Sequence, residues 1–332
     1  MGRIVVMGAG SWGTALARVV ASKGNEVILW DYKAERAKSL QEARVNAKFL
    51  PDAKFPETLT VTSEIKGLLT DAEYLIMSIP SQSLRSVIAK VSDQLTEKTI
   101  VVNTAKGIEI SSGMRLSQVM KDEILGKYHK NIVVLSGPTH AEEVAKNLPT
   151  TIVAAGEPEV AKKVQELFNT ESFRVYESND IIGVELGGAV KNGIAIAAGV
   201  ADGIGFGDNT KAALITRGLA EIVRFGEALG AKKETFSGLT GMGDLIVTCA
   251  SLHSRNRHVG QKLGEGKKLS EILDEMQMVA EGVPTVKAVY ELAQKKGVSM
   301  PILEGVYKVL YEDKLAIEMV KQLMTRDLKR EF

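Results

Sequence analysis

Cysteine is almost absent from this chain of 332 residues, in which Cys249 is the single example. One cysteine excludes an internal disulfide and a zinc site built from a cysteine cluster. The four histidines include no pair four residues apart, as a helical metal site requires, and no carboxylate accompanies them in a known ligand pattern. We therefore expect no metal ion, and a reducing, cytoplasmic location fits this cysteine usage best.

An excess of either charge is also missing, because 42 basic residues stand against 41 acidic ones, which gives a net charge of +1. This balance argues against nucleic acid or an anionic membrane surface as a partner. Long apolar runs are lacking too. Glycines interrupt the N-terminal sequence MGRIVVMGAGSWG too early for a signal peptide, and no stretch is expected to reach the roughly 20 apolar residues of a membrane span.

The length exceeds the roughly 100 to 200 residues of one ordinary core, so we expect two domains. The first half alternates strand and helix patterns. Arg3 to Met7 is an apolar strand, Thr14 to Ser22 has helical periodicity, and Glu26 to Asp31 forms the next strand. Later buried-strand patterns cover 74–79, 99–103, 132–136 and 151–155. Such alternation predicts an α/β, mainly parallel, doubly wound sheet, which binds ligands beyond the carboxyl ends of its strands.

From about Asn179 the pattern changes to long helical stretches. We therefore predict a dinucleotide-binding domain over residues 1–179 and an all-α substrate and catalytic domain over residues 180–332.

The first strand is followed by Gly8-Ala9-Gly10-Ser11-Trp12-Gly13, which matches the G-x-G-x-x-G fingerprint of dinucleotide-binding, Rossmann-like folds. Gly8 permits the tight turn, Gly10 lets the backbone approach a pyrophosphate, and Gly13 allows close contact between helix and sheet. Asp31 ends the second strand, where an acidic residue normally binds the ribose. A plain glycine turn is the alternative, but the complete strand-turn-helix-strand unit favours the cofactor.

The choice between NAD and NADP stays open in the sequence. Asp31 favours NAD by accepting from the 2′-hydroxyl and repelling a 2′-phosphate, whereas Tyr32 and Lys33 directly after it can accommodate that phosphate. Trp12 has two equally good interpretations, as a shield for the cofactor or as filler of a domain interface.

Two further loops follow predicted strands at the same edge of the sheet. Lys106 stands in NTAKGIE, where we expect it to bind an anion of substrate or cofactor. The segment SGPTHA directs backbone N–H groups and the Thr139 hydroxyl toward that edge, although it is equally compatible with an ordinary turn. We assign no catalytic role to His140, because no orienting carboxylate is evident.

The segment from Glu185 to Gly193, ELGGAVKNG, has too many glycines for an ordinary helix, which indicates a close approach of another group. Tight helix packing explains the glycines but not a lysine among Ala, Val and Ile. A lysine in apolar surroundings tends toward a lowered pKa, which suits a proton donor to a carbinol oxygen. Lys191 is therefore the catalytic candidate.

Two polar stretches of the helical half complete the candidate site. Ser254, Arg255 and Asn256 offer a hydroxyl, a guanidinium and an amide, which suit a phosphate and its neighbouring hydroxyls, although a charged helix face is the alternative. Asp244, in TGMGDL, can accept from a substrate hydroxyl or hold a lysine in place, and the sequence does not separate these roles.

The ordered motifs GAGSWG, SIPSQ, NTAKGIE, SGPTHAEEVA, ELGGAVKNG, GMGDLIVTC, SRN and VAEGV resemble the bacterial NAD(P)-dependent glycerol-3-phosphate dehydrogenases over nearly the whole chain. The resemblance implies hydride transfer between NAD(P)H and dihydroxyacetone phosphate, with Lys191 as the proton-transfer residue. It also implies supply of sn-glycerol 3-phosphate for phospholipid synthesis. The family often carries a basic residue where this chain has Tyr32, which keeps the preference for NADP open.

Carried over by position, the resemblance implies a dinucleotide-contacting set made of Ser11, Trp12, Tyr32, Lys33, Lys106, Ala141, Arg255, Val279 and Glu281. It implies a substrate-contacting set made of Lys106, Gly137, Thr139, Lys191, Asp244, Ser254, Arg255 and Asn256. A related dehydrogenase acting on a hydroxy acid or a hydroxyacyl thioester is the nearest alternative. A dinucleotide sensor without chemistry is a remote one, and a homodimer is the default assembly.

Overall fold

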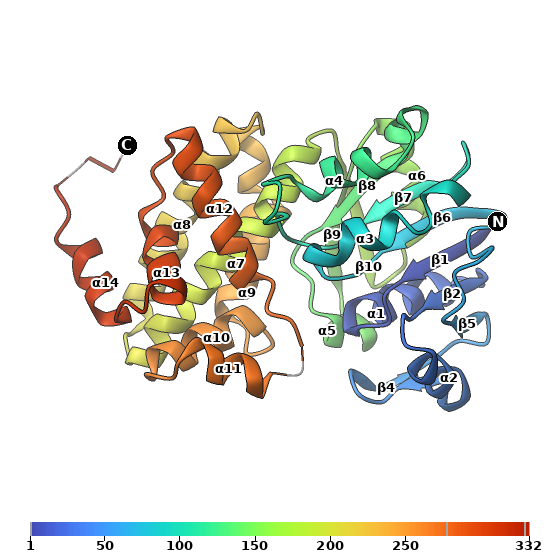
Figure 1. Cartoon of the computed structure of the whole chain (residues 1–332), viewed down its shortest axis with the longest axis horizontal. Helices are drawn as coiled ribbons and strands as arrows, with labels where there is room; N and C mark the ends of the chain where they lie inside the picture. The colour runs from blue at the N-terminus through green and yellow to red at the C-terminus, as the bar shows by residue number, and fades with distance from the viewer. Residues whose placement is uncertain (1, 277, 329, 332) are drawn as a thin grey trace. The chain divides into compact units, whose positions relative to one another are not determined.

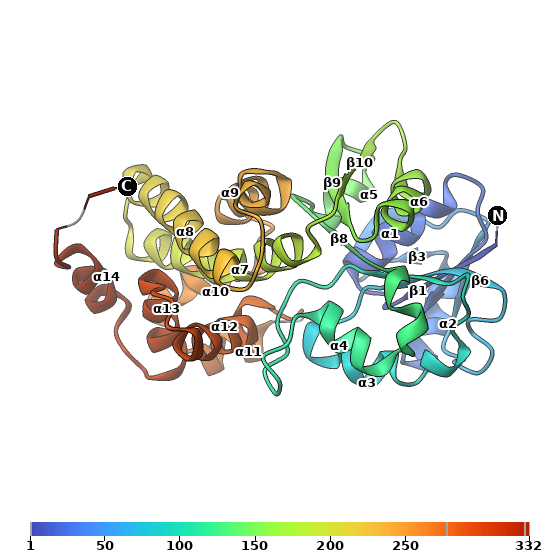
Figure 2. The ribbon, with the colours of Figure 1, turned by 90° about the horizontal axis from the view of Figure 1, so that it is seen from above.

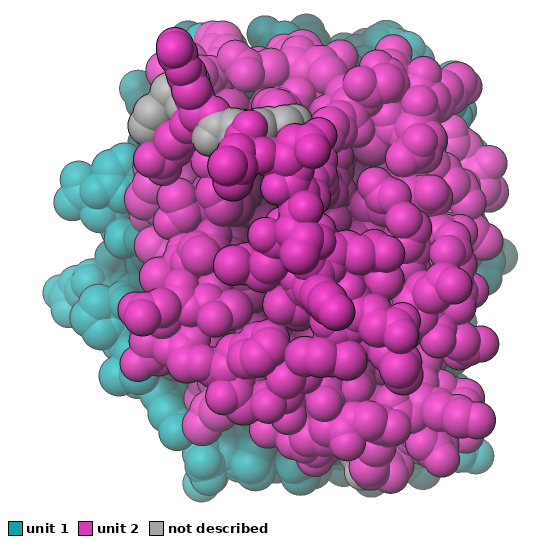
Figure 3. All heavy atoms as spheres, turned by 90° about the vertical axis from the view of Figure 1, so that its left-hand side faces the viewer, with its two compact units in different colours: residues 1–109, 114–185 teal, residues 110–113, 186–332 magenta. Residues whose placement is uncertain are grey.

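The computed structural model describes residues 2–276, 278–328 and 330–331, and the chain divides into two compact units (Figures 1 and 3). Unit 1 comprises residues 1–109 and 114–185, and unit 2 comprises residues 110–113 and 186–332. Unit 1 contains a large sheet covered by helices. In the described part of unit 2 the regular elements are helical. The α/β fold with a helical C-terminal part is thereby confirmed.

The sheet of unit 1 has eight strands in the order β10-β9-β8-β7-β6-β1-β2-β5. Their bounds are β1 Arg3–Met7, β2 Val27–Trp30, β5 Leu59–Thr62, β6 Ala72–Met77, β7 Ile100–Asn103, β8 Ile132–Ser136, β9 Thr150–Ala155 and β10 Phe173–Ser178. From β5 to β8 in this order the strands are parallel. Strand β9 is antiparallel to β8, and β10 is parallel to β9. The parallel part is the doubly wound sheet that alternating strands and helices predict.

Both faces of this sheet are buried, which explains why its strands are apolar at successive positions. Ile4 and Val6 of β1 pack into one core, whereas Val5 and Met7 pack into the other. Helices α1 Ser11–Ala21, α5 Ala141–Ala145 and α6 Pro158–Phe168 cover the first face, and α3 Leu84–Ile88 and α4 Leu116–Glu123 cover the second (Figure 2). Loops at the carboxyl ends of the parallel strands are therefore fixed from two sides.

A short hairpin, β3 Val45–Asn46 with β4 Leu50–Lys54, follows helix α2 Ala34–Ala43. Asn46 anchors it, because the side-chain amide donates to the carbonyl of Ala9 at 3.0 Å and to the hydroxyl of Thr14 at 2.9 Å. The hairpin is thereby tied to the glycine loop after β1. Nothing in the strand or helix patterns of the sequence predicted it.

Unit 2 is built around α7 Ile181–Ile204, which is buried along most of its length. Its other helices are α8 Asp208–Ala228, α9 Asp244–Ala250, α10 Arg255–Gly264, α11 Leu269–Glu275, α12 Gly282–Lys296, α13 Pro301–Tyr311 and α14 Ala316–Met324. A Cβ at Gly199 would lie 2.0 Å from the carbonyl oxygen of Arg257, and one at Gly260 would lie 1.9 Å from that of Ile196. Helices α7 and α10 thus touch backbone to backbone, which only glycine permits.

The expectation that no segment reaches the length of a membrane span was wrong for α7. This helix is long and apolar enough by length and composition, but 83% of its apolar window is buried inside the structure. A core helix that is apolar on all sides passes the same test. It is therefore weak evidence for a span.

The two units divide between residues 185 and 186, six residues after the position expected from the sequence. Glu185, in the second turn of α7, explains the difference: its carboxylate accepts from the backbone N–H of Ser117 at 2.7 Å and pairs with Arg115. These contacts hold the start of α7 on α4, inside unit 1. The domain boundary after residue 179 stays a prediction.

Candidate functional site

The glycine loop after β1 has the geometry that its sequence predicts. Gly8 has φ +112°, a left-handed conformation that favours glycine, and a Cβ there would lie 2.2 Å from the carbonyl oxygen of Ser78. At Gly13 a Cβ would lie 1.9 Å from the carbonyl oxygen of Gly8. Both glycines are therefore required by packing within unit 1.

Gly10 differs, because the structure places no heavy atom within 4 Å of a Cβ built there. Packing among the described residues does not need a glycine at this point, whereas a phosphate approaching the first N–H groups of α1 does. No side chain of the described residues caps this helix start. The loop thus fits a dinucleotide pyrophosphate, with Ser11 and Trp12 in the first turn of α1. Trp12 packs partly against the core, and its buried indole N–H has no partner in the described structure.

Asp31 follows β2 as expected, but its side chain is fully buried. One carboxylate oxygen accepts from the backbone N–H of Lys33 at 2.9 Å, and the other accepts from Nε of Arg36 at 2.7 Å. The guanidinium also forms a close ion pair with it. The sequence pointed to Asp31, Tyr32 and Lys33 but not to Arg36. Arg36 lies five residues after Asp31, and this spacing gives no signal of a contact. Tyr32 itself is 67% exposed.

The predicted residues after β7 and β8 lie together. Nζ of Lys106 donates to the carbonyl oxygen of Gly137 at 2.8 Å, and the Thr139 hydroxyl donates to the same oxygen at 3.2 Å. Asn103 holds the turn before Lys106 by bonds to the backbone of Ala105. An ammonium, a hydroxyl and the backbone of the SGPT loop thus meet at the carboxyl edge of the sheet, where an anion can be bound.

Ala141 and His140 begin α5 beside this group. Ala141 is buried, and the backbone carbonyl of His140 accepts the first N–H groups of the helix, from Glu143 and Val144. These contacts involve only the backbone of His140, so the absence of a catalytic role for its imidazole stays a prediction.

Lys191 lies on α7 with only 5% of its surface exposed. Its ammonium donates to Oδ1 of Asp244 at 2.8 Å and to the hydroxyl of Thr248. Thr248 in turn donates to the backbone carbonyl of Asp244 at 2.6 Å. The surroundings are thus less apolar than the neighbouring sequence suggested, because a buried carboxylate stabilises the charged ammonium. Of the two roles open to Asp244, the structure shows the one of holding a lysine.

The position of Asp244 depends on local helix geometry. It is the first residue of α9, directly after the π-helical turn Leu239–Gly243, and a carboxylate in a first helical turn is stabilised by the helix dipole. A Cβ at Gly187 would lie 2.6 Å from the carbonyl oxygen of Thr240 in that turn. Gly187 therefore lets α7, which carries Lys191, approach the turn that precedes Asp244.

Cys249 follows Thr248 and is also buried. Burial raises the pKa of its thiol to about 12. The thiol therefore stays protonated near neutral pH and is no nucleophile.

Asn256 joins three helices of unit 2. Its side-chain amide donates to the side-chain oxygen of Asn192 on α7 at 2.9 Å and accepts from the backbone N–H of Gly282, at the start of α12, at 2.8 Å. Asn192, next to Lys191, is a further functional candidate, which the sequence did not single out. Its only signal in the sequence is an amide in an otherwise apolar helix.

The remaining predicted residues lie around the start of α10. Ser254 caps this helix, since its hydroxyl accepts from the backbone N–H of Arg257 at 3.2 Å. The guanidinium of Arg255 donates to the carbonyl oxygen of Val279 at 2.7 Å, and Glu281 directly precedes α12. Ser254, Arg255 and Asn256 thus cluster at one helix N-terminus, where an anion is favoured.

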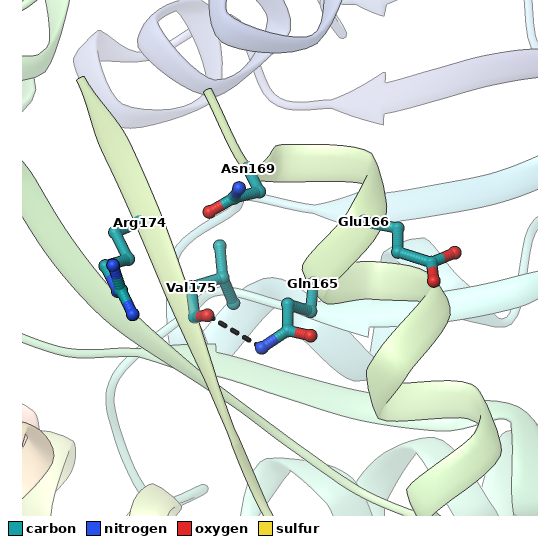
Figure 4. A pocket seen from close by; sticks show the side chains of 5 residues that line it. All are labelled: Gln165, Glu166, Asn169, Arg174 and Val175. Carbon is teal, nitrogen blue, oxygen red and sulfur yellow. Dashed lines mark hydrogen bonds between the residues drawn. The ribbon is translucent and has the colours of Figure 1, made fainter. Parts of the chain in front are cut away.

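A separate cavity of about 290 Å³ lies between the end of α6 and the start of β10 (Figure 4). Its lining residues are Gln165, Glu166, Asn169, Arg174 and Val175. None of these belongs to the predicted site, and the amide of Gln165 is engaged with the carbonyl oxygen of Val175 at 2.9 Å. We assign it no ligand.

Comparison with known proteins identifies the family of this chain. Residues 3–162 match the family described as NAD-dependent glycerol-3-phosphate dehydrogenase N-terminus, and residues 180–321 match the C-terminus of the same family. The chain is 51% identical over 330 residues to the NAD(P)+ glycerol-3-phosphate dehydrogenase of Geobacter sulfurreducens, covering 99% of this chain and 98% of the relative. It is 50% identical over 333 residues to that of Lysinibacillus sphaericus, covering 100% and 98%.

The crystal structure of glycerol-3-phosphate dehydrogenase from Coxiella burnetii superposes with a TM-score of 0.93 at 39% identity, covering 98% of this chain and 99% of that one. Sequence and fold therefore lead to the same result, and the chain belongs to the family of NAD-dependent glycerol-3-phosphate dehydrogenases.

Proposed function

We propose that this protein reduces dihydroxyacetone phosphate to sn-glycerol 3-phosphate with NADH or NADPH, and so supplies glycerol 3-phosphate for phospholipid synthesis. The observation that carries the proposal is the buried ammonium of Lys191 held by Asp244 and Thr248. A buried lysine bound in this way is a proton donor at a fixed position. Relatives that match over the full length support this reaction, since their names specify glycerol 3-phosphate and NAD(P)+.

The reduced nicotinamide supplies a hydride to C2 of the substrate when the cofactor is bound. Lys191 donates its proton to the oxygen on C2 as that oxygen becomes an alkoxide, and the resulting neutral amine takes a proton from water. Asp244 and Thr248 hold the ammonium in a fixed orientation before the transfer. In the oxidative direction Lys191 accepts the proton from the alcohol.

The phosphate of the substrate is assigned to Arg255 and the start of α10, with Ser254 and Asn256 beside it. Asn256 is held by Asn192 and Gly282, so its remaining amide hydrogen has a fixed direction. Lys106, with Gly137 and Thr139, is assigned to an anionic or hydroxyl group at the edge of the sheet. Binding the phosphate away from C2 orients the reacting carbon, which lowers the activation barrier by several kcal/mol.

The dinucleotide is assigned to the glycine loop Gly8, Gly10 and Gly13 and to the loop after β2, with Ala141, Val279 and Glu281 as further contacts. We also propose a cytoplasmic homodimer, which rests on the cysteine usage and on the commonest symmetry of soluble enzymes. Size-exclusion chromatography with light scattering tests the dimer, and a monomer would refute it.

The decisive test follows the absorbance of reduced nicotinamide with dihydroxyacetone phosphate, using NADH and NADPH in parallel. Lys191→Ala is expected to lower kcat by about 10³-fold or more, because a positioned acid contributes about 10²- to 10⁴-fold. Calorimetric binding of the dinucleotide is expected to stay nearly unchanged. The exposed Lys295→Ala on α12 is the matched control. Loss of binding together with turnover would contradict the role of Lys191.

Arg255→Ala separates this function from that of a hydroxy-acid or hydroxyacyl dehydrogenase. We expect a large rise of KM for dihydroxyacetone phosphate and little change for unphosphorylated dihydroxyacetone, because only the former uses the guanidinium. Equal effects on both substrates, or a faster reaction with a hydroxy acid, would favour the alternative.

A further inference from the structure

The acidic residue after β2 is the usual determinant of NAD specificity, since its charge repels a 2′-phosphate. In this protein that charge is compensated. Both oxygens of Asp31 are engaged, one by the backbone N–H of Lys33 and the other by the guanidinium of Arg36. The Asp31 side chain is completely buried, whereas that of Arg36 is 31% exposed. Solvent and ligands therefore meet the cation of the pair and not the anion.

Arg36 lies among other cations and two aromatic rings. Its guanidinium carbon is 5.8 Å from the ring centroid of Tyr32 and 5.9 Å from that of Phe49. Nζ of Lys33 is 5.5 Å from the Tyr32 ring, and Nζ of Lys48 is 5.4 Å from the Phe49 ring. Stacking on aromatic faces orients a guanidinium without removing its hydrogen-bond donors. The cluster carries three positive charges against the one buried carboxylate of Asp31.

This cluster, formed by Tyr32, Lys33, Arg36, Lys48 and Phe49, is fixed next to the glycine loop. Lys48 and Phe49 belong to the hairpin that Asn46 ties to the carbonyl of Ala9 and the hydroxyl of Thr14. Lys33 and Arg36 follow β2, the neighbour of β1 in the sheet. All of these contacts lie within unit 1. A dinucleotide whose pyrophosphate binds the glycine loop extends its adenosine toward the end of β2 in this fold.

We propose that Arg36 determines the acceptance of NADP: it neutralises Asp31 and offers its guanidinium, with Lys33, to the 2′-phosphate of the adenosine. This proposal rests on the function proposed above and names the cofactor that the same site accepts. Nε and Nη2 of Arg36 stay on Asp31, and the N–H groups of Nη1 are the donors offered to the phosphate oxygens. With NAD, Arg36 keeps its contact with Asp31 and the site loses nothing. The arrangement thus allows both cofactors.

The test measures binding of the nucleotide fragment, so that it does not depend on turnover. Calorimetry compares adenosine 2′,5′-bisphosphate, which carries the 2′-phosphate, with adenosine 5′-diphosphate, which lacks it. In Arg36→Gln we expect the affinity for the 2′-phosphorylated fragment to fall about 10- to 100-fold, the usual effect of losing a charged hydrogen-bond pair. The affinity for adenosine 5′-diphosphate should change by less than about threefold.

Lys38→Gln is the matched control, because it removes one positive charge from the same helix at a side chain that is 79% exposed and pairs only loosely with Glu42. It should leave both affinities unchanged. If Arg36→Gln lowers the affinity for both fragments equally, or lowers neither affinity, the proposal is overturned. A circular dichroism melting curve of each variant identifies a loss caused by unfolding.

Asp31→Asn gives the converse test. Removing the carboxylate while keeping Arg36 should raise the ratio of the two affinities about three- to tenfold in favour of the 2′-phosphorylated fragment. A falling ratio would refute the role of Arg36. If the fragments behave as expected but dihydroxyacetone phosphate is not reduced with either cofactor, the proposed function fails while the role of Arg36 stands.

Discussion

Unit 1 and unit 2 build their candidate sites from different parts of the chain. At the glycine loop of unit 1 the important groups belong to the main chain: N–H groups at the start of α1 and glycines that exclude a Cβ. In unit 2 they are side chains buried between helices, such as Lys191 with Asp244 and Asn192 with Asn256. A main-chain site depends on the path of the backbone, whereas a side-chain site depends on a few polar contacts. Substitutions should therefore affect the two sites in different ways.

Among the substitutions that compare the two units, the largest effect is expected from Asp244→Asn. The amide cannot neutralise the ammonium of Lys191, so kcat should fall about 100-fold through misplacement of the proton donor. Dinucleotide binding should stay within about threefold, because the glycine loop is unaffected. Stopped-flow absorbance and calorimetry measure the two effects, with Asp274→Asn at an exposed site of α11 as the control. If Asp244→Asn also weakens dinucleotide binding, the two units do not respond independently to substitution.

Gly260→Ala tests whether unit 2 also depends on its main chain. The added methyl group would lie 1.9 Å from the backbone carbonyl oxygen of Ile196, which cannot move without shifting α7. We expect a loss of about 3 kcal/mol in the free energy of unfolding, measured by urea denaturation. Gly207→Ala, where a Cβ meets no atom within 4 Å, should cost at most about 1 kcal/mol. If both variants lose the same free energy of unfolding, the close contact between α7 and α10 is not the reason for a glycine at position 260.

Gly10→Ala and Gly13→Ala sharpen the comparison inside the glycine loop itself. The first should lower dinucleotide affinity about tenfold or more with stability nearly unchanged, because its methyl group has free space in the protein. The second should mainly lower the melting temperature, since its methyl group would meet the carbonyl oxygen of Gly8. Calorimetry and thermal melting separate the two effects. Identical behaviour of the two variants would remove the assignment of Gly10 to the pyrophosphate.

An effect of pH is expected at Glu221 on α8, whose buried carboxylate accepts from the backbone N–H groups of Ile302 and Leu303 at the start of α13. Burial raises the pKa of this carboxyl to about 7. A carboxyl with a raised pKa in the folded state binds its proton more tightly than in the unfolded chain. Stability should therefore fall as pH rises between about 4.3 and 7, by at most about 1.4 kcal/mol per pH unit.

Glu221→Gln should remove this pH dependence, whereas the exposed Glu227→Gln on the same helix should keep it. Urea midpoints across that pH range measure the effect. A variant with the same slope as the unmodified protein would show that another group titrates.

The same contrast explains what the sequence could predict. The central strands of unit 1 were predictable because both faces of the sheet are buried, which makes residues such as Ile4 and Val5 apolar in succession. The glycine loop was predictable from spacing, because Gly8 and Gly13 meet local backbone constraints and Gly10 leaves room for a phosphate. The edge strand β10 was missed, because the predicted strands are continuous apolar runs, whereas apolar and polar residues alternate in FRVYES, as in a half-exposed strand.

The pairs that build the site of unit 2 could not be predicted in this way. Asn192 meets Asn256, and Lys191 meets Thr248, across more than 50 residues of sequence. Such contacts depend on how helices cross, which periodicity does not encode. Lys191 could be selected because a lysine in an apolar helix is unusual, whereas Arg36 looked like one more charged residue of a surface helix.

The central position of α7 has a consequence for the synthesis of the chain. Its partners in unit 2 come later in the sequence: Thr240 packs at Gly187, α10 packs at Gly199, and Val286 packs at Gly193. A ribosome therefore releases this apolar helix well before the segments that cover it, and exposed apolar segments of nascent chains aggregate or bind chaperones. A chain cut shortly after residue 204 should be insoluble, whereas one that ends after α13 should bury the helix.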